Sequence, residues 1–267
     1  LGEHTNATGS TTGTVYLILG SEKGIFSRDI EFTPNQFRGE HEYSGAGRSV
    51  SGAGDINGDG LDDMLIGAPG TMYDDRMHGA VYILEGEEDE TWDRSLLGAD
   101  SKLIGEFSED GAGGTVSRAG DVNGDGYDDI FIGASGYADY AGRAYLVHGT
   151  SVGIKDMSLS DADAKITGDS KKLRVGRYIS EAGDVNGDGY ADLLVGAKRF
   201  DSDGDEEGAA YLIYGPIEDK GGNLDDLGVR MEGVMASSNA GVQVLGMSDL
   251  DGDGTDEVFV SATTVGT

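Results

Sequence analysis

A nine-residue acidic loop occurs four times in this sequence, at intervals of about 65 residues. The copies align without gaps, and each begins with Asp, has Gly at its sixth position and ends with Asp or Glu. They are DINGDGLDD from Asp55, DVNGDGYDD from Asp121, DVNGDGYAD from Asp184 and DLDGDGTDE from Asp249. Repetition at one period indicates that the chain is built from copies of a single structural unit.

Each unit also carries short segments that favour β-strands. An apolar segment such as DMLIGA follows every acidic loop, and a glycine-led segment comes later in the unit. The glycine-led segments begin at Gly13, Gly79, Gly142 and Gly208. No stretch of a dozen residues keeps the apolar period of a helix. Four short strands per unit of about 65 residues predict an all-β fold, a β-propeller with one blade per repeat. Residues 1–267 are expected to form a single propeller domain or propeller segment.

The acidic loops have the oxygen-rich composition that calcium prefers. Ca²⁺ takes six to eight oxygen ligands at about 2.3–2.6 Å. A loop can surround the ion with the side chains of positions 1, 3 and 5, the carbonyl of position 7 and the carboxylate of position 9, while glycine at position 6 permits the sharp bend. We therefore predict four Ca²⁺ sites. The expected ligands are Asp55, Asn57, Asp59, the carbonyl of Leu61 and Asp63; Asp121, Asn123, Asp125, the carbonyl of Tyr127 and Asp129; Asp184, Asn186, Asp188, the carbonyl of Tyr190 and Asp192; and Asp249, Asp251, Asp253, the carbonyl of Thr255 and Glu257.

An EF-hand, a magnesium site or a metal-free turn fits the loop sequences less well. An EF-hand needs Glu at position 12, where this chain has Ile66, Ile132, Val195 or Val260. Magnesium retains water and takes fewer protein ligands, and an all-oxygen ligand set argues against zinc or copper. Without any ion, 16 acidic residues would lie in four short loops, where close carboxylates repel one another.

The ions are expected to serve structure rather than catalysis, because the motif would use every side-chain oxygen as a ligand. His4, His41, His78 and His148 have no catalytic or metal-binding spacing. The sequence contains no HExxH motif. We therefore do not expect an enzyme.

The formal net charge of −31 restricts the partners of the chain. Nucleic-acid phosphates require Lys and Arg, so we expect no nucleic-acid binding. No apolar run approaches the roughly 18 residues of a membrane span, so direct membrane insertion is not expected. The first residue is Leu1 and no signal peptide precedes it, which indicates a processed protein or an excised fragment.

The acidic loop, the apolar segment after it and the GxxYL segment resemble the FG-GAP repeat, which builds the β-propeller of integrin α subunits and of many bacterial and archaeal surface proteins. The resemblance covers nearly the whole chain in four registered copies. It implies four-stranded antiparallel blades with a calcium loop between the first and second strands of each. It also implies extracellular adhesion or ligand recognition at a cell surface, commonly through the face opposite the metals. The family's Phe-Gly pair is replaced here by Ala46-Gly47, Ala112-Gly113, Val175-Gly176 and Ala240-Gly241.

Three functions are compatible with this resemblance. The leading one is a calcium-stabilised module for adhesion or protein-ligand recognition, and the second is a lectin-like propeller that binds a glycan. The third is a non-catalytic propeller domain of a larger secreted enzyme. Integrin propellers usually contain cysteine and this chain has none, so the resemblance points to a bacterial or archaeal relative.

Two arrangements of the chain ends fit the order of the segments. The chain begins just before a third-strand segment and ends just after a second-strand segment. The two ends would then complete one blade and close a four-blade ring. Alternatively, the chain forms part of a larger propeller, which the family resemblance favours slightly.

Several further features lie outside the acidic loops. The segment Asp201–Glu207 resembles a fifth metal loop but lacks an acid at position 9, so we expect a solvated loop. It aligns with Tyr73–Asp75 and Tyr137–Tyr140, and these segments are expected to share the face opposite the metals, where tyrosines favour partner contacts. Asn6 begins a glycosylation sequon, and Trp92 is expected to be a packing anchor.

Overall fold

A computed structural model describes residues 2–3, 12–22, 30, 33–88, 94–169, 173–201, 207–218, 221–235 and 237–263. The sequon at Asn6, the side chain of Trp92 and most of the segment Asp201–Glu207 lie outside the described residues. The described part is built from strands with a few single-turn helices, which confirms the expectation of an all-β chain. None of the described helices has the length and apolar character needed to cross a bilayer.

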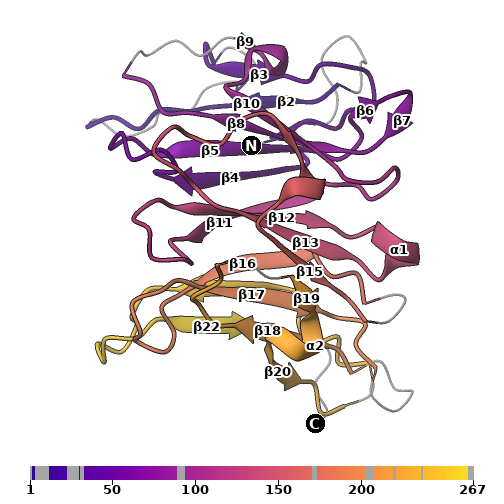
Figure 1. Cartoon of the computed structure of the whole chain (residues 1–267), viewed down its shortest axis with the longest axis vertical. Coiled ribbons are helices and arrows are strands. Elements are labelled where there is room, and N and C mark those ends of the chain that lie inside the picture. The colour runs from indigo at the N-terminus through magenta and orange to yellow at the C-terminus, as the bar shows by residue number, and fades with distance from the viewer. Residues whose placement is uncertain are drawn as a thin grey trace.

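Three sheets follow one another along the chain, and each contains a four-stranded antiparallel meander. The first has β4 (Ser49–Gly54), β5 (Asp63–Ala68), β8 (Ala80–Leu84) and β10 (Ser101–Ile104). The second has β11 (Thr115–Gly120), β12 (Asp129–Ala134), β13 (Arg143–Val147) and β15 (Ala164–Thr167). The third has β16 (Tyr178–Gly183), β17 (Asp192–Ala197), β18 (Ala209–Ile213) and β20 (Val229–Glu232). Figure 1 shows these sheets stacked along the long axis of the molecule.

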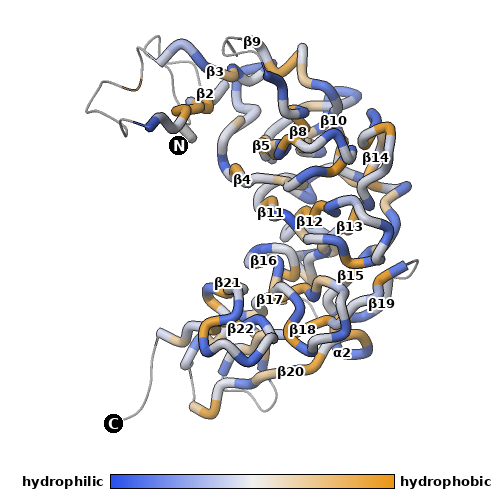
Figure 2. Tube along the Cα trace, turned by 90° about the vertical axis from the view of Figure 1, so that its left-hand side faces the viewer, coloured by the Kyte–Doolittle hydropathy of each residue, from blue (hydrophilic) through white to orange (hydrophobic). Residues whose placement is uncertain are grey.

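A smaller sheet lies at each end of this series. At the N-terminal end, β2 (Thr14–Tyr16) pairs with β1 (Gly2–Glu3) and β3 (Gln36–Arg38). At the C-terminal end, β21 (Val244–Met247) pairs with β22 (Glu257–Val260). The sheets follow an arc with β2–β3 at one end and β21–β22 at the other (Figure 2). No described strand of one end sheet pairs with the other, and the single-domain assignment of residues 1–267 stays a prediction.

Neighbouring sheets are interlocked by short parallel strands. The segment between the third and fourth strands of one sheet pairs with the last strand of the sheet before it. These strands are β9 (Arg94–Ser95) beside β3, β14 (Met157–Ser158) beside β10, and β19 (Gly222–Asn223) beside β15. Each leads into one helical turn with a buried leucine: η2 (Leu96–Gly98), η3 (Leu159–Asp161) and α2 (Leu224–Leu227). Every complete sheet therefore adds one strand to the edge of the preceding sheet.

The hydrophobic core lies between adjacent sheets. One cluster joins Leu65 and Ile83 of the first sheet to Ile130 and Ile132 of the second, and a similar cluster joins the second to the third. Every residue of β12 and β17 is buried, because both faces of these strands are covered by neighbouring sheets. This explains why their sequences are continuously apolar rather than alternating.

Glycines bring adjacent sheets into backbone contact. A Cβ atom at Gly133 of β12 would lie 1.8 Å from the carbonyl oxygen of Gly176, which precedes β16 in the next sheet. The pairs Gly67 with Gly113 and Gly196 with Gly241 show the same close approach. Any side chain at these positions would force the sheets apart.

We expect Gly133→Ala to destabilise the fold by more than about 2 kcal/mol, because the added methyl group overpacks a rigid backbone contact. Gly52 in β4 is the matched control, since nothing lies within 4 Å of a Cβ built there. Chemical denaturation of both variants checks this. Equal stability of Gly133→Ala and Gly52→Ala would contradict the role assigned to the contact.

One buried carboxyl group interrupts the packing. Asp110 is 4 % exposed and its Oδ2 has no hydrogen-bond partner. Ser44 and Ser238 occupy the equivalent positions of other repeats, and each donates a hydrogen bond to a backbone carbonyl, that of Thr12 or Glu207. Burial raises the pKa of Asp110 to about 7, although the Phe107 amide and the Arg143 charge act to lower it.

The Asp110→Ser variant is expected to be more stable than the wild type at neutral pH. The folded pKa is above the unfolded value near 4, so the favourable contribution of the protonated group is complete below about pH 4 and is lost as the pH rises through 7. The stability difference should therefore grow by roughly 4 kcal/mol between about pH 4 and 7 and then level off. Denaturation at a series of pH values in saturating calcium measures it. A difference independent of pH would show that Asp110 does not titrate as described.

Candidate metal centre

The four acidic loops close equivalent hairpins. They connect β4 to β5, β11 to β12, β16 to β17 and β21 to β22, so they lie at one end of their sheets. In the three complete sheets, the strand register shifts by one residue just before the loop. The bulged residues are Ala53, Ala119 and Ala182, all fully buried. A bulge bends a strand locally, so the first strand of each complete sheet bends at the equivalent residue, just before its acidic loop.

The first aspartate of each loop orders the backbone around it. In the first loop, Asp55 Oδ1 accepts hydrogen bonds from the amides of Gly58 and Asp59 at 2.7 and 3.1 Å. Asp55 Oδ2 accepts from the Gly60 amide at 2.9 Å. Asp121, Asp184 and Asp249 each make the same three bonds in their own loops. One carboxylate thus accepts from three amides of the turn, and the Asp59 amide also donates to Asn57 Oδ1 at 2.9 Å.

Positions 3 and 5 face one another above this turn. The Asn57 side-chain amide donates to Asp59 Oδ2 at 3.0 Å, while Asp59 Oδ1 accepts from the Leu61 amide at 2.8 Å. The second and third loops repeat both bonds. The structure therefore brings together the side chains of positions 1, 3 and 5 that the sequence predicts as ligands.

The carboxylate at position 9 is buried at the base of the loop in each of the three complete sheets. Asp63 Oδ2 accepts from the Ile56 amide at 3.0 Å, and its Oδ1 accepts from the Gly86 amide at 2.7 Å. Asp129 and Asp192 make the equivalent bonds. Gly86 follows β8, so this carboxylate ties the loop to the third strand of its sheet. Its assignment as a calcium ligand stays a prediction.

Burial disfavours the ionised form of these position 9 carboxylates. Burial raises the pKa of Asp63 to about 6 and that of Asp129 to about 7, although backbone amides act to lower both values. The pKa of Asp192 shifts in the same direction for the same reason. A divalent cation in the loop would favour the ionised form of each group.

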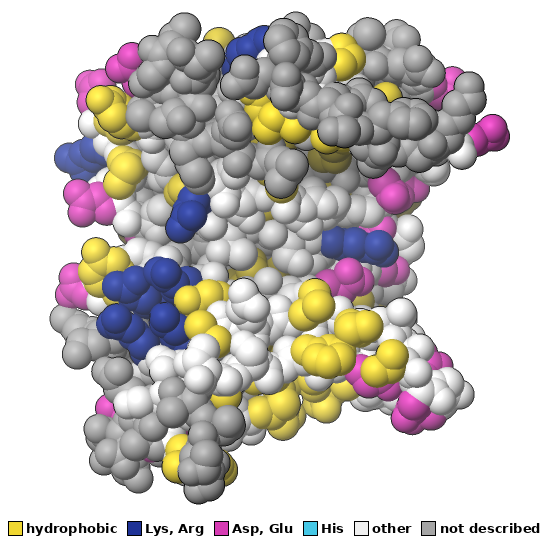
Figure 3. Space-filling view, turned by 180° about the vertical axis from the view of Figure 1, so that it is seen from behind, with side chains coloured by type: hydrophobic (Ala, Val, Ile, Leu, Met, Phe, Trp, Pro, Cys, Tyr) yellow, Lys and Arg dark blue, Asp and Glu magenta, His cyan; other side chains and the backbone are white. Residues whose placement is uncertain are grey.

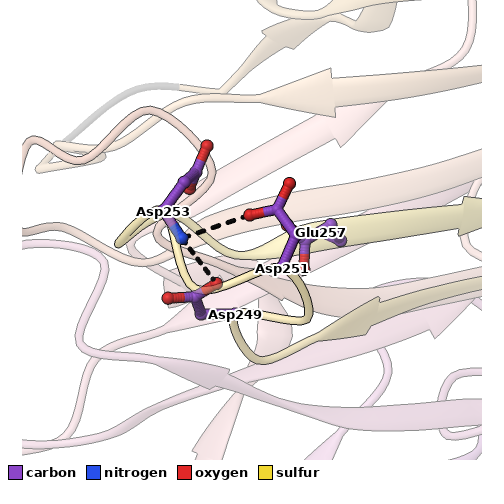
Figure 4. A group of neighbouring side chains, drawn as sticks. All are labelled: Asp249, Asp251, Asp253 and Glu257. Atoms are coloured by element: carbon purple, nitrogen blue, oxygen red, sulfur yellow. Dashed lines mark hydrogen bonds between the residues drawn. The ribbon is translucent and has the colours of Figure 1, made fainter.

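The fourth loop shows most directly that a calcium ion fits. Asp249, Asp251, Asp253 and Glu257 each offer a carboxylate oxygen, and these atoms all lie within 4.8 Å of one another. Ligands on opposite sides of a Ca²⁺ ion lie about 4.6–5.2 Å apart, given calcium–oxygen distances of about 2.3–2.6 Å. In Figure 4 the amide of Asp253 donates to Asp249 and Asp251, which holds the three carboxylates at one end of the hairpin. The all-oxygen ligand set suits a hard cation.

The structure also shows links between successive loops that sequence reasoning missed. The amide of each eighth-position residue donates to the first-position carbonyl of the preceding loop, as from Asp128 to Asp55 at 3.1 Å. Asp128 Oδ2 also accepts from the Asp55 amide at 2.9 Å, and its Oδ1 pairs with Arg118 at 2.8 Å. Asp256 makes the equivalent bond to the Asp184 amide. Ala191 at the same position of the third loop has only the backbone link. In the sequence, the links between loops are indicated only by whether position 8 is Asp or Ala.

Position 7 contributes a second contact between loops. A Cβ atom at Gly58 would lie 2.6 Å from the Tyr127 ring of the next loop, and one at Gly124 would lie 2.5 Å from the Tyr190 ring. The residue predicted to offer its carbonyl to calcium therefore packs its side chain on the neighbouring loop. The loops form a continuous row rather than four separate turns.

The expected second face lies at the opposite end of the sheets. The hairpin of β6 (Met72–Tyr73) and β7 (Arg76–Met77) follows β5, and the short turn α1 (Tyr137–Tyr140) follows β12. Figure 1 shows both on the side away from the acidic loops. Tyr73 and Tyr140 are about half exposed there.

We expect Asp128→Ala to lower the free energy of unfolding by about 1.5 kcal/mol, because it removes charge-assisted hydrogen bonds between two loops. Asp62→Ala is the control, since it removes the same charge from position 8 of the first loop, where no bond to another loop is described. Urea denaturation in saturating calcium compares the two. A similar loss for both variants would show that the link between loops carries no stability of its own.

Comparisons with known proteins agree with this geometry. A sequence model described as the FG-GAP repeat matches residues 46–84, 113–147 and 178–213, which confirms the resemblance seen in the sequence. Each match begins near the first strand of a complete sheet and ends at its third strand.

Integrin α chains are among the similar proteins. Integrin alpha pat-2 of Caenorhabditis elegans is 29% identical over 89% of this chain and 20% of its own length. Integrin alpha-PS3 of Drosophila melanogaster is 31% identical over 62% of this chain and 14% of its own length. Integrin alpha-5 of Xenopus laevis is 33% identical over 62% of this chain and 16% of its own length. The chain thus spans about a fifth or less of these relatives.

Proposed function

Because this chain is an FG-GAP repeat protein, we propose that it forms a calcium-stabilised β-propeller, or part of one, that recognises a ligand at a cell surface. Each complete sheet is one blade, and the two end sheets are parts of further blades. Four Ca²⁺ ions occupy the loops between first and second strands, held by the twenty ligands given above. The ions serve structure, and the molecule binds without catalysis in an extracellular setting.

The repeated hydrogen-bond pattern of the loops carries this proposal. In all four loops the same carboxylate oxygens accept the same three amides, which holds two further oxygen-bearing side chains beside them. With a net charge of −31, the folded chain has a strong demand for cations. Ions that bind only the folded state would supply both charge and stability.

Residues at the opposite face support the binding role. Loops on a rigid scaffold are where recognition residues concentrate, and tyrosine is favoured at interfaces. The exposed Tyr73 and Tyr140 lie there, beyond the reach of the calcium loops. The glycan-binding alternative, the role as a module of a secreted enzyme and the microbial origin stay predictions from the sequence.

Chelation is expected to lower the melting temperature by about 10 °C or more. Calcium at about 10 mM is roughly 100 times a Kd of about 10⁻⁴ M, and each site would then stabilise the fold by about 2.7 kcal/mol. Melting curves with calcium, with magnesium and with a calcium chelator measure this. Calorimetric titration of the calcium-free chain should give four bound ions.

A variant pair separates calcium binding from simple charge. Asp249→Asn with Asp253→Asn removes two predicted ligands of the fourth loop, and the stoichiometry should fall from four ions to three. Asp74→Asn with Asp75→Asn removes the same charge from the β6–β7 turn and should leave four ions. A melting temperature that is the same with calcium and with chelator would overturn the proposal.

A further inference from the structure

Four basic side chains gather at one place in this acidic molecule. Arg174, Arg177, Lys198 and Arg199 form what we call the third-repeat cation cluster, in a chain with 19 basic and 50 acidic residues. Figure 3 shows Lys and Arg side chains concentrated in one group on the concave side of the arc. Such a concentration runs against the overall charge, so it calls for a physical reason.

The cluster lies at the end of the third sheet away from its acidic loop. Arg177 directly precedes β16, and Lys198 directly follows β17. These two strands are joined at their other end by the loop that begins at Asp184. The cluster therefore occupies the face on which ligand recognition is proposed.

Strand register allows each residue of the cluster to be compared with the first two repeats. Gly196 pairs with Tyr178 in the third sheet, just as Gly133 pairs with Thr115 and Gly67 with Ser49. The flanking residues then correspond one for one. Pro69 and Ser135 correspond to Lys198, Gly70 and Gly136 to Arg199, Gly45 and Gly111 to Arg174, and Arg48 and Gly114 to Arg177. Three of the four cations therefore have only small, uncharged counterparts.

Arg174 occupies a backbone conformation that disfavours it. Its φ is 57°, and the equivalent residues Gly45 and Gly111 have φ of 64° and 65°. A side chain in this left-handed region costs about 1–2 kcal/mol relative to glycine. The Nε of Arg174 is also buried without a hydrogen-bond partner. The contact of Arg174 with the Tyr140 ring therefore comes at the cost of a strained backbone, and strain of this kind concentrates at functional sites.

Three of the four cations lie against tyrosine rings instead of carboxylates. The guanidinium carbon of Arg174 lies 4.7 Å from the Tyr140 ring centre. Arg177 and Lys198 lie 5.6 and 5.9 Å from the ring centre of Tyr178, and Arg177 Nε donates to the Tyr178 hydroxyl at 3.1 Å. Among the described residues, no carboxylate forms an ion pair with any cation of the cluster.

The local potential is positive as a result. Burial acts to raise the pKa of Tyr178, yet the hydrogen bond from Arg177 and the charges of Arg177 and Lys198 lower it overall. Arg177 and Lys198 are partly exposed, so an anion in solvent can reach their N–H groups beside the Tyr178 ring.

We propose that the third-repeat cation cluster binds carboxylate side chains of an acidic segment in the protein ligand. This inference rests on the proposed ligand-binding function and adds the chemistry of the partner. Guanidinium groups pair with carboxylates through two parallel hydrogen bonds, which gives geometric selectivity as well as attraction. Tyr178 adds a partly apolar surface beside the charges.

The charges around the cluster favour a short acidic segment over a long polyanion. The exposed Asp139 precedes the Tyr140 that Arg174 contacts, and the exposed Asp201 follows Arg199 by two residues. The whole chain carries a net charge of −31. A sulfated polysaccharide or nucleic acid that extended past the cluster would meet this negative field and be repelled. A peptide with a few neighbouring carboxylates needs only the cluster itself.

Fluorescence anisotropy of a labelled hexaglutamate peptide with the calcium-loaded full chain tests the inference. We expect saturable binding that weakens as salt is raised, because exposed charges are screened within about 10 Å at 0.1 M salt. A hexalysine peptide should not bind the same cluster. Absence of hexaglutamate binding at low salt would overturn the inference, while the calcium dependence of folding would stand as a separate result.

Variants that restore second-repeat residues assign the binding to the cluster. Arg177→Gly with Lys198→Ser copies Gly114 and Ser135 and should weaken peptide binding at least about tenfold, on the scale of two lost ion pairs. The matched control Arg48→Gly with Arg76→Ser removes two exposed cations from the first repeat and should change binding less than twofold. Equal weakening by both variants would overturn the assignment.

Arg174→Gly separates binding from stability. The variant should melt at a higher temperature, because it removes a strained backbone position, and should still bind the peptide more weakly. Loss of binding therefore cannot come from unfolding. A heparin-derived oligosaccharide is the competing probe, and tighter binding of this polyanion than of hexaglutamate would replace the acidic peptide as the partner.

Discussion

The molecule depends on the hydrogen bonds that the first aspartate of each acidic loop accepts from the backbone. Asp55 and its three counterparts each accept hydrogen bonds from three backbone amides in the turn between the first two strands. The same residue brings a negative charge to a place where other carboxylates already gather. The turn is therefore well ordered by hydrogen bonds and poorly balanced in charge, and calcium is the proposed balance.

The two ends of each sheet carry different connections. The acidic loops lie at one end, and the connections between the second and third strands lie at the other. At the loop end, Asp128 and Asp256 carry one loop into contact with the next, so the row behaves as a continuous rim. At the other end, the connections between the second and third strands differ between repeats, as the β6–β7 hairpin and α1 show. Shared structure at one rim leaves the other free to vary, which is where the cation cluster occurs.

The sequence predicted the parts of the fold that repeat at short range. The period located all four hairpins, and the apolar segments after them are the buried strands β5, β12, β17 and the less buried β22. It did not predict the parallel strands β9, β14 and β19, because two-residue pairings with a distant strand leave no local pattern. In the site, positions 1, 3 and 5 meet as expected, whereas the links made by Asp128 cross 73 residues and carry no spacing signal. The cation cluster was missed because its members, such as Arg174 and Lys198, are separated along the chain and join only across a strand pair.

The parallel edge strands β9, β14 and β19 determine where such a chain can be divided. A cut after β10 follows the sequence boundary between two repeats, yet it removes β14, which completes the edge of the first sheet, and the buried Leu159 that follows it. A unit that keeps its own edge covered must therefore extend well into the next repeat. Duplication, recombination or engineered fusion of these repeats will succeed where each unit also keeps the edge strand and buried leucine from the following repeat. Division at the sequence boundary between repeats will fail.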